Sequence, residues 1–446
     1  MPRGKKASTG SSRSRDGPRR TKCQSASEIA RNVNSFETWA TFQGCEEVAY
    51  RDIPRDLKAD VKKVFKIRAQ LPKDWLDKSS DASRELLAWL SPEFVCFIRS
   101  IGEASPELFT ARVSPETLRE LVCDLQVVHS AWKRLQKMRE SSRKWSEADY
   151  VANVYNVFRT PAVSNSDFRA QCSVTLAQPL ACFTLAPKSV RVLNAKSVSP
   201  DSAIYIPYHL VRELSFDAKS PYKVLKAHPT ATNHGSIGGE SSFRYQATPC
   251  TKLPERPTFE FVSAFWEDKK PMHHLLEDAY RQNRMATTSA VRQLHFLRIR
   301  APIFGLVWAQ GTVRAHVDWW DSKPDTEYPS VRSAAYPGPK HSSRRASGIF
   351  HEWNLDEPTD ILQVFFLVRN IDCWTVDGFR DRVVEGISQL VTDVTVNGHK
   401  FTPWKRKGDL YRSIPMEVPA SRPSFSVTPT ISPSSTPPRK RKHAGR

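Results

Sequence analysis

The sequence has no CxxC pair among its eight cysteines, which stand at positions 23, 45, 96, 123, 172, 182, 250 and 373. Paired cysteines at that spacing are typical of zinc fingers and ribbons, so we expect no structural zinc site of this kind. No secretory signal pattern precedes the cysteines, and we expect free thiols in a reducing compartment. No apolar run approaches the roughly 18 residues that a membrane-spanning helix needs, so we expect a soluble intracellular protein with no membrane partner.

Acidic residues are almost missing from both ends of the chain. Residues 1–27 hold eight Lys/Arg against one Asp, and residues 419–446 hold six Lys/Arg and no acid. The two ends therefore supply +7 and +6 of a formal net charge of +20. A basic chain attracts polyanions, which predicts a nucleic-acid partner, with DNA favoured over RNA. Because most of this charge lies in the tails, it could also serve intracellular targeting or non-specific attraction to polyanions, without a shaped binding groove.

Composition divides the chain into four segments. Residues 1–27 have almost nothing to bury and are predicted to be a disordered basic tail. Residues 28–139 space their apolar side chains at three and four, which predicts a helical region whose role the sequence does not indicate. Residues 140–416 form the main domain, and residues 417–446 are a disordered tail rich in Pro, Ser and Thr. The "RKRK" at 439–442 is typical of a nuclear localisation signal, so we expect the nucleus and an import receptor as partner; a random basic tail is the alternative.

Strand and helix signals are mixed within residues 140–416. An amphipathic helix is predicted over 146–163, with Ser146 as its N-cap. Long loops are predicted over 217–257 and 322–347. Strands are predicted over 172–178, 189–195, 202–211, 259–268, 301–310, 312–320 and 349–355, with a hairpin turning at Gln310-Gly311. Further helices are predicted over 275–299, 359–371 and 375–391. This order predicts an α/β or α+β domain, with a mixed central sheet flanked by helices.

One pair of strands carries residues suited to chemistry. The apolar run "FEFVSAFWEDKK" ends in Glu267 and Lys269, and Asp201 follows a proline at the start of another strand. Side chains alternate along a strand, so Glu267 and Lys269 should point to the same side. If the strands are adjacent, Asp201 could join them. Two carboxylates and a peptide carbonyl suit Mg²⁺ or Mn²⁺, and a lysine beside the cation can position a water and steady negative charge on a phosphate.

These residues resemble the motif of the PD-(D/E)XK nuclease superfamily, and the chain is most similar to a fungal group of nuclease-like proteins within it. The resemblance covers roughly residues 140–390 and implies a restriction-endonuclease-like fold. It implies Asp201 and Glu267 as catalytic metal ligands and Lys269 as the catalytic lysine. It also implies support from Glu147 on the preceding helix and from Gln282, which follows Ala279 on the next helix.

Simpler interpretations stand beside each of these roles. Glu267 and Lys269 could be solvated charges where a strand reaches the surface, and Asp201 a turn residue. Glu147 could be a first-turn acid favoured by the helix dipole, and Gln282 a solvated position. Asp268 and Lys270 fit the motif in the opposite register, but an apolar residue directly before the acid favours Glu267.

The sequence therefore predicts one of two functions. The first is a metal-dependent nuclease, or a nuclease-like protein, that hydrolyses nucleic-acid phosphodiester bonds. The second is a catalytically inactive module of the same fold that binds nucleic acid or protein in the nucleus.

Overall fold

A mixed β-sheet forms the centre of the computed structural model, which describes residues 23–81, 84, 90–111, 115–180, 185–228, 258–269, 276–309, 311–322, 329–339, 350–399 and 404–405. Within these ranges eight strands join in the order β1-β11-β10-β9-β8-β7-β4, with β12 paired to β10. The strands are β1 (Cys45–Val48), β4 (Asp167–Ala170), β7 (Ser202–Tyr205), β8 (Val262–Asp268), β9 (Ile303–Ala309), β10 (Thr312–Ser322), β11 (Pro329–Ala335) and β12 (Trp353–Asn354). Strands β8 and β9 run parallel, as do β1 and β11, and the other pairs are antiparallel. The predicted mixed α/β fold is confirmed.

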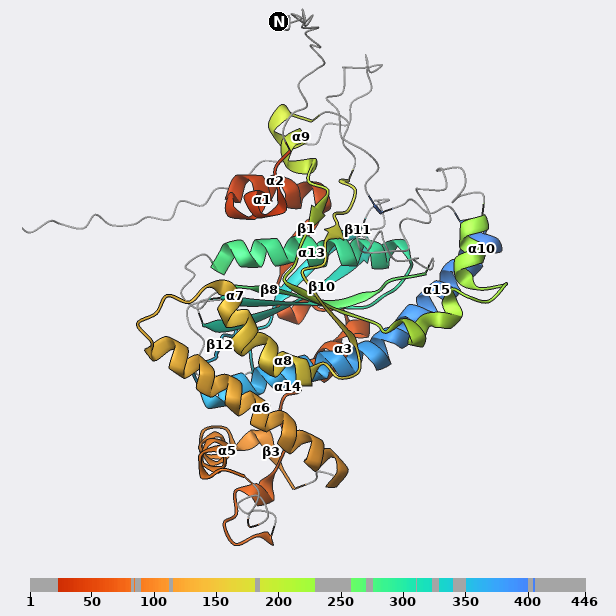
Figure 1. Ribbon diagram of the computed structural model, residues 1–446. Helices are drawn as coiled ribbons and strands as arrows, with labels where there is room; N and C mark the ends of the chain where they lie inside the picture. Colours follow the sequence, from red (N-terminus) through yellow and green to blue (C-terminus); the bar gives the residue numbers. More distant parts are fainter. Residues whose placement is uncertain are drawn as a thin grey trace, which may run out of the picture. The chain divides into compact units, whose positions relative to one another are not determined.

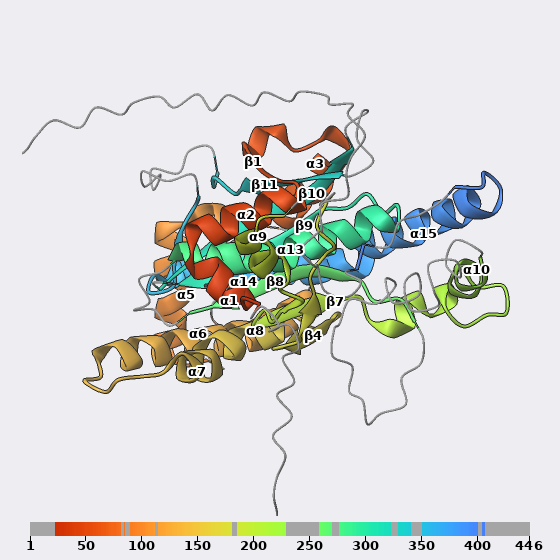
Figure 2. The same ribbon diagram turned by 90° about the horizontal axis from the view of Figure 1, so that it is seen from above.

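Helices cover both faces of the sheet (Figure 1). On one face, α13 (Leu276–Phe296) contacts β8, β9 and β10, and α1 (Ala26–Arg31) lies over α13. On the other face lie α3 (Arg55–Val64), α8 (Asn156–Ala162) and α14 (Pro358–Trp374), and Figure 2 shows the same layers from above. Aromatic rings on this second face join helix to strand, as in the contact of Phe158 with Trp308 and of Trp374 with Phe304. Burial of these large rings stabilises the packing of the helices on this face of the sheet.

The N-terminal helical region packs against the same sheet. Helices α5 (Pro92–Ala104) and α6 (Pro115–Glu140) contact α14, and the described residues belong to one compact unit. This region is not wholly helical, because β1 extends the sheet beside β11. Two further short strands, β2 (Leu71–Pro72) and β3 (Phe109–Thr110), pair with each other. The remaining elements of this region are α2 (Val33–Gln43), η1 (Tyr50–Asp52), η2 (Lys73–Trp75) and η3 (Pro106–Leu108).

Several predicted elements are confirmed. The helix predicted from residue 146 begins with a capping box in which Ser146 and Asp149 bond each other's backbone N–H, and it continues as α7 (Glu147–Tyr150), the π-helical turn η4 (Val151–Tyr155) and α8. Strands β9 and β10 pair antiparallel, and the left-handed φ of 75° at Gly311 suits the turn between them. Gln310 lies outside the described residues. Helices α6, α13 and α14 also lie where they were predicted, and α15 (Arg380–Thr395) follows a second π-helical turn, η7 (Thr375–Phe379).

Several other predicted elements were wrong. Residues 189–195 are not a strand, because Pro187 occupies the first turn of α9 (Pro187–Leu193), whose branched side chains are buried. The loop predicted over 322–347 contains β11, which pairs with β10 and β1. The strand predicted over 202–211 ends as β7 at Tyr205, and η5 (Tyr208–Leu214) follows Pro207.

Short elements complete the description. Helix α10 (Pro221–Ala227) lies in the loop predicted over 217–257, of which residues 229–257 are outside the described ranges. Strands β5 (Val174–Thr175) and β6 (Ser197–Val198) pair with each other. The predicted tail at 417–446 lies outside the described ranges, as do residues 1–22 of the tail predicted at 1–27. The end of that first tail was predicted wrongly, because α1 begins at Ala26 with Ser25 as its N-cap. Across the described ranges, no helix has both the length and the apolarity needed to cross a membrane.

Candidate active site

Strand β8 delivers Glu267 and Lys269 to one point at its carboxyl end. The Lys269 Nζ donates a hydrogen bond of 2.7 Å to Glu267 Oε1, so the two side chains meet on one side, as strand alternation predicts. Glu267 is fully buried because β8 lies between β7 and β9 in the interior of the sheet. Lys269 is half-buried just beyond the strand.

Asp201 reaches this point because β7 runs antiparallel beside β8. The register pairs Ser202 with Trp266, which places residue 201 next to the carboxyl end of β8. Asp201 Oδ2 accepts a hydrogen bond of 2.7 Å from the Asp268 N–H and lies 3.8 Å from Lys269 Nζ. The 66 positions between Asp201 and Glu267 are therefore no obstacle to their meeting.

Glu147 completes the cluster from a third element. It stands in the first turn of α7, and its Oε1 lies 3.9 Å from Lys269 Nζ. The same helix supports Lys269 from a second position, since the Tyr155 hydroxyl donates a hydrogen bond of 3.1 Å to the Lys269 carbonyl oxygen. Tyr155 lies in the π-helical turn η4, a kind of irregularity that is frequent at functional sites. We call Glu147, Asp201, Glu267 and Lys269 the acid–lysine cluster.

Asp268 takes the opposite face of β8 and has a different role. Its carboxylate accepts two hydrogen bonds from the Arg159 guanidinium, at 2.8 Å and 2.7 Å, in the protein interior. The Arg159 guanidinium also lies over the rings of Trp266 and Trp308. The Asp268 carboxylate is thus bound to Arg159 and not to Lys269, which favours the Glu267/Lys269 register. Lys270, the other half of the alternative register, lies outside the described residues.

Gln282 is not joined to the cluster in the described part of the chain. It is half-buried on α13 and forms no hydrogen bond with Glu147, Asp201, Glu267 or Lys269. The next residue, Asn283, points to the sheet instead and donates hydrogen bonds to the Phe265 and Leu306 carbonyl oxygens. The sequence did indicate that Asn283 faces the sheet, because Ala279 and Asn283 are four residues apart and therefore share one face of the helix.

The cluster concentrates negative charge in a poorly hydrated place. Burial, together with the nearby Asp268 charge, raises the pKa of Asp201 to about 6. Burial and the Asp201 charge raise the pKa of Glu267 well above its ordinary value. Burial lowers the pKa of Lys269, but Glu267 and Asp201 outweigh it and the net change is upward. Lys269 therefore stays an ammonium at neutral pH, suited to hold charge rather than to take a proton.

The oxygens of the cluster suit a hard cation. Glu267 Oε1, the Asp268 carbonyl oxygen and Asp201 Oδ2 lie 2.7, 3.1 and 3.8 Å from the Lys269 ammonium. The second oxygen of Glu267, Oε2, is buried with no hydrogen-bond partner in the described structure. No three His, Cys, Asp or Glu side chains of the described residues are grouped as a metal site. Two carboxylates and a carbonyl nonetheless fit Mg²⁺, which usually keeps several of its waters.

Comparison with known proteins does not name a family. No protein-family model matches the sequence, and no curated protein matches it either. The function is therefore inferred from the residues of the acid–lysine cluster and from their geometry.

Proposed function

We propose that this protein is a metal-dependent nuclease, or a nuclease-like protein, of the PD-(D/E)XK type. The observation that carries the proposal is the meeting of Asp201, Glu267 and Lys269 at the end of β8. Residues from two strands and one helix, far apart in the sequence, converge on one ammonium group. Solvated strand ends would have no reason to converge in this way, and buried like charges are typical of functional sites.

Each residue has a distinct task in this proposal. Asp201 and Glu267 would hold Mg²⁺ or Mn²⁺ through their carboxylate oxygens, with the Asp268 carbonyl oxygen as a third donor. When bound, the cation supplies Lewis-acid stabilisation of phosphate charge and lowers the pKa of water. Lys269 steadies the negative charge that develops on the phosphate and orients the attacking water. Glu147 and Tyr155 hold Lys269 in place from the side of α7 and η4.

The alternative is a catalytically inactive module of the same fold. The observation that favours it is the 2.7 Å hydrogen bond by which Lys269 already satisfies one Glu267 oxygen. Such a module would bind nucleic acid or protein without cleaving it. Nuclear localisation through residues 439–442, with an import receptor as partner, remains a prediction in either case, since those residues lie outside the described ranges.

A cleavage assay tests the proposal. The full chain is incubated with labelled DNA and RNA in Mg²⁺ or Mn²⁺, with EDTA as the blank. Glu267→Gln and Lys269→Met should each lower the cleavage rate by about 100-fold or more. The first weakens a ligand of the cation, and the second removes the ammonium that steadies charge on the phosphate. The matched controls are Glu385→Gln and Lys58→Met, which change exposed residues. Cleavage that survives both cluster variants would mean a different site, and no cleavage by the wild type would favour the inactive module.

A further inference from the structure

Four exposed cations lie along the chain just before Glu147. Arg134 and Lys137 stand in the last turns of α6, and Arg143 and Lys144 in the segment that leads to α7. None of the four side chains forms a hydrogen bond or ion pair within the described structure. We call these four residues the basic track.

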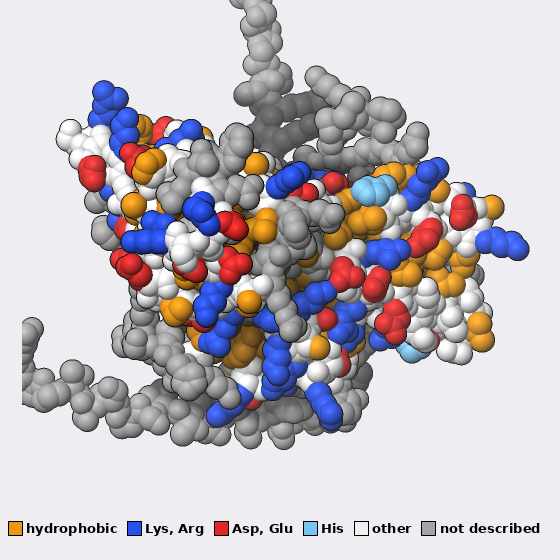
Figure 3. Space-filling model, turned by 90° about the horizontal axis from the view of Figure 1, so that it is seen from below, with side chains coloured by type: hydrophobic (Ala, Val, Ile, Leu, Met, Phe, Trp, Pro, Cys, Tyr) orange, Lys and Arg blue, Asp and Glu red, His pale blue; other side chains and the backbone are white. Residues whose placement is uncertain are grey.

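Two neighbouring cations on the same helix are neutralised by partners, whereas other exposed cations, such as Arg55, Lys58 and Lys62 on α3, have no partner in the described structure. On α6 itself, Lys133 pairs with Glu93 at 2.5 Å, and Arg139 pairs with Asp356 at 2.7 Å. Figure 3 shows Lys and Arg interspersed with Asp and Glu over the face seen from below. A run of unpaired cations has no such structural task, and their charge remains available to a ligand.

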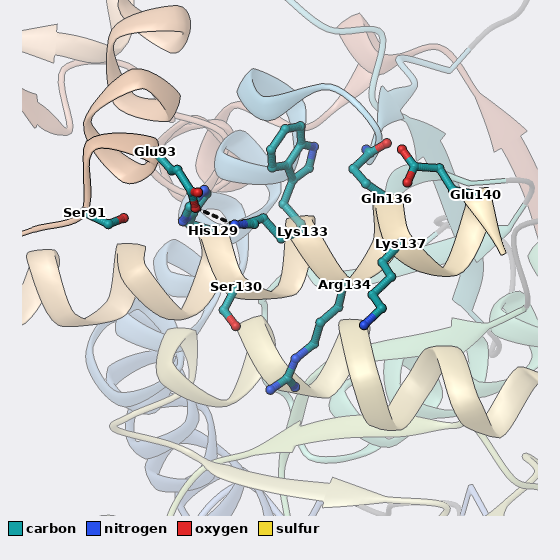
Figure 4. Close-up of a pocket in the computed structure, with 10 residues that line it drawn as sticks. Ser91, Glu93, His129, Ser130, Lys133, Arg134, Gln136, Lys137 and Glu140 are labelled. Carbon is teal, nitrogen blue, oxygen red and sulfur yellow. Dashed lines mark hydrogen bonds and ion pairs between the residues drawn. The ribbon is translucent and has the colours of Figure 1, made fainter.

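The arrangement of the track suits an extended polyanion. Arg134 and Lys137 are three residues apart, about 4.5 Å along the helix axis, and Figure 4 shows them projecting from the same side of α6 as Ser130. They line an open groove of about 830 Å³, together with Lys133 and the two acids Glu93 and Glu140. Helix α6 packs along η4 and α8, the helix that begins at Glu147.

The track comes directly before one residue of the acid–lysine cluster along the chain. Lys144 is three residues before Glu147, whose carboxylate lies 3.9 Å from Lys269 Nζ. A chain of phosphates lying on Arg134, Lys137, Arg143 and Lys144 would thus continue toward the cluster. A row of cations beside a reactive centre can bind the phosphates of a nucleic acid. Such contacts hold the backbone in place but do not depend on the base sequence.

We propose that the basic track binds the phosphate backbone of the nucleic acid and guides the strand to the acid–lysine cluster. This inference rests on the proposed function of the cluster, and it identifies the partner surface of that site. The ligand is a nucleic-acid strand long enough to lie on the track and the cluster together. Binding on the track should be largely independent of base sequence.

A binding experiment on the full chain tests the track separately from catalysis. Fluorescent single- and double-stranded DNA is titrated in EDTA, where divalent cations are absent, over a series of salt concentrations. The track variant carries Arg134→Gln, Lys137→Gln, Arg143→Gln and Lys144→Gln. The matched control carries Arg55→Gln, Lys58→Gln, Lys62→Gln and Arg68→Gln, which remove the same number of exposed arginines and lysines around α3.

The track variant should bind roughly ten- to 100-fold more weakly at 0.1 M salt, since several phosphate contacts are lost. The slope of log affinity against log salt concentration should be less steep than that of the wild type by about two to four. The control should bind like the wild type, because both variants keep the basic tails. Circular dichroism should show both variants folded.

The possible outcomes separate the two proposals. Equal losses in both variants would mean attraction by net charge alone and would overturn the track, as would no loss in the track variant. A track-dependent loss of binding in a protein that cleaves nothing would leave the track standing and remove catalysis. Preferential binding of an acidic protein over DNA by the same four residues would also overturn the proposal.

Discussion

The main-chain N–H of Asp268 donates a hydrogen bond of 2.7 Å to the side chain of Asp201. This bond ties the residue before β7 to the carboxyl end of β8, where Glu267 and Lys269 also lie. Asp201 is thereby held as an acceptor next to two other acids, a position that a freely solvated turn residue would not keep. The hydrogen bond fixes the position of Asp201, although its negative charge is repelled by the other acids of the site. Sites that lower the stability of the fold in this way are common where function requires them.

Asp201→Asn should stabilise the protein above pH 6 in the absence of divalent cations. The folded-state pKa of Asp201, about 6, lies above the unfolded value of about 3.9. The folded wild type therefore binds more protons than the unfolded chain between these values, and its stability falls as pH rises from about 4 to 6. Asparagine does not titrate, and its side-chain oxygen can still accept the Asp268 N–H. The gain should grow over this window to about 1–3 kcal/mol.

Urea unfolding at pH 4, 5, 7 and 8 measures this difference. The control is Asp381→Asn, whose carboxylate is largely exposed on α15. A gain for Asp201→Asn that is the same at every pH would contradict the interpretation, because it would not come from the carboxylate charge.

Arg159 should be essential for stability because its partner is buried. The side chains of Arg159 and Asp268 are 0% and 1% exposed. Arg159→Met leaves the Asp268 carboxylate without its cation and should lower the free energy of unfolding by about 3–5 kcal/mol. The double variant Arg159→Met, Asp268→Leu removes both charges and should recover much of that loss.

The matched control is Lys63→Met, which breaks an exposed ion pair instead of a buried one. Lys63 and Asp377 are 57% and 61% exposed, so breaking their ion pair should cost about 0–1 kcal/mol. If Arg159→Met costs no more than Lys63→Met in urea unfolding, the buried pair has no such role.

Gly305 should tolerate no side chain, because α13 approaches the sheet closely there. A Cβ at this position would collide with His316 Nε2 and Asn283 Oδ1, which are hydrogen-bonded to each other at 2.8 Å. Gly305→Ala should therefore cost about 3 kcal/mol of unfolding free energy. Gly398→Ala, where a Cβ meets nothing within 4 Å, should cost only about 1 kcal/mol for its left-handed φ. Similar costs at the two glycines would show that α13 can move away from β9.

The sequence was informative where the structure depends on local periodicity. Strand β8, helix α13 and the turn at Gly311 follow from alternation, helical spacing and a glycine. The meeting of Glu267 and Lys269 needs only the two-residue period of a strand. For Asp201, the sequence offered a candidate, but its contact depends on β7 pairing with β8.

Features that depend on distant partners could not be predicted from local patterns. Strand β11 has the composition of a loop and is a strand because β10 and β1 flank it. Arg159 and Asp268 are 109 positions apart, and nothing in either local pattern links them. Gln282 was preferred to Asn283 by family resemblance, whereas the phase of the helix places Asn283 on the sheet.

Divalent cations should stabilise the wild type through the acid–lysine cluster. A ligand that binds only the folded state at ten times its Kd adds about 1.4 kcal/mol to the free energy of unfolding. Unfolding in millimolar Mg²⁺ or Mn²⁺ should therefore shift upward relative to EDTA. Glu267→Gln should remove most of this shift, because the neutral amide is a weaker ligand, whereas Glu385→Gln on the exposed face of α15 should keep it. The measurement needs no turnover, so it detects a metal site even in a protein that cleaves nothing. An equal shift in Glu267→Gln and the wild type would place any bound cation elsewhere and remove the metal-dependent mechanism from this cluster.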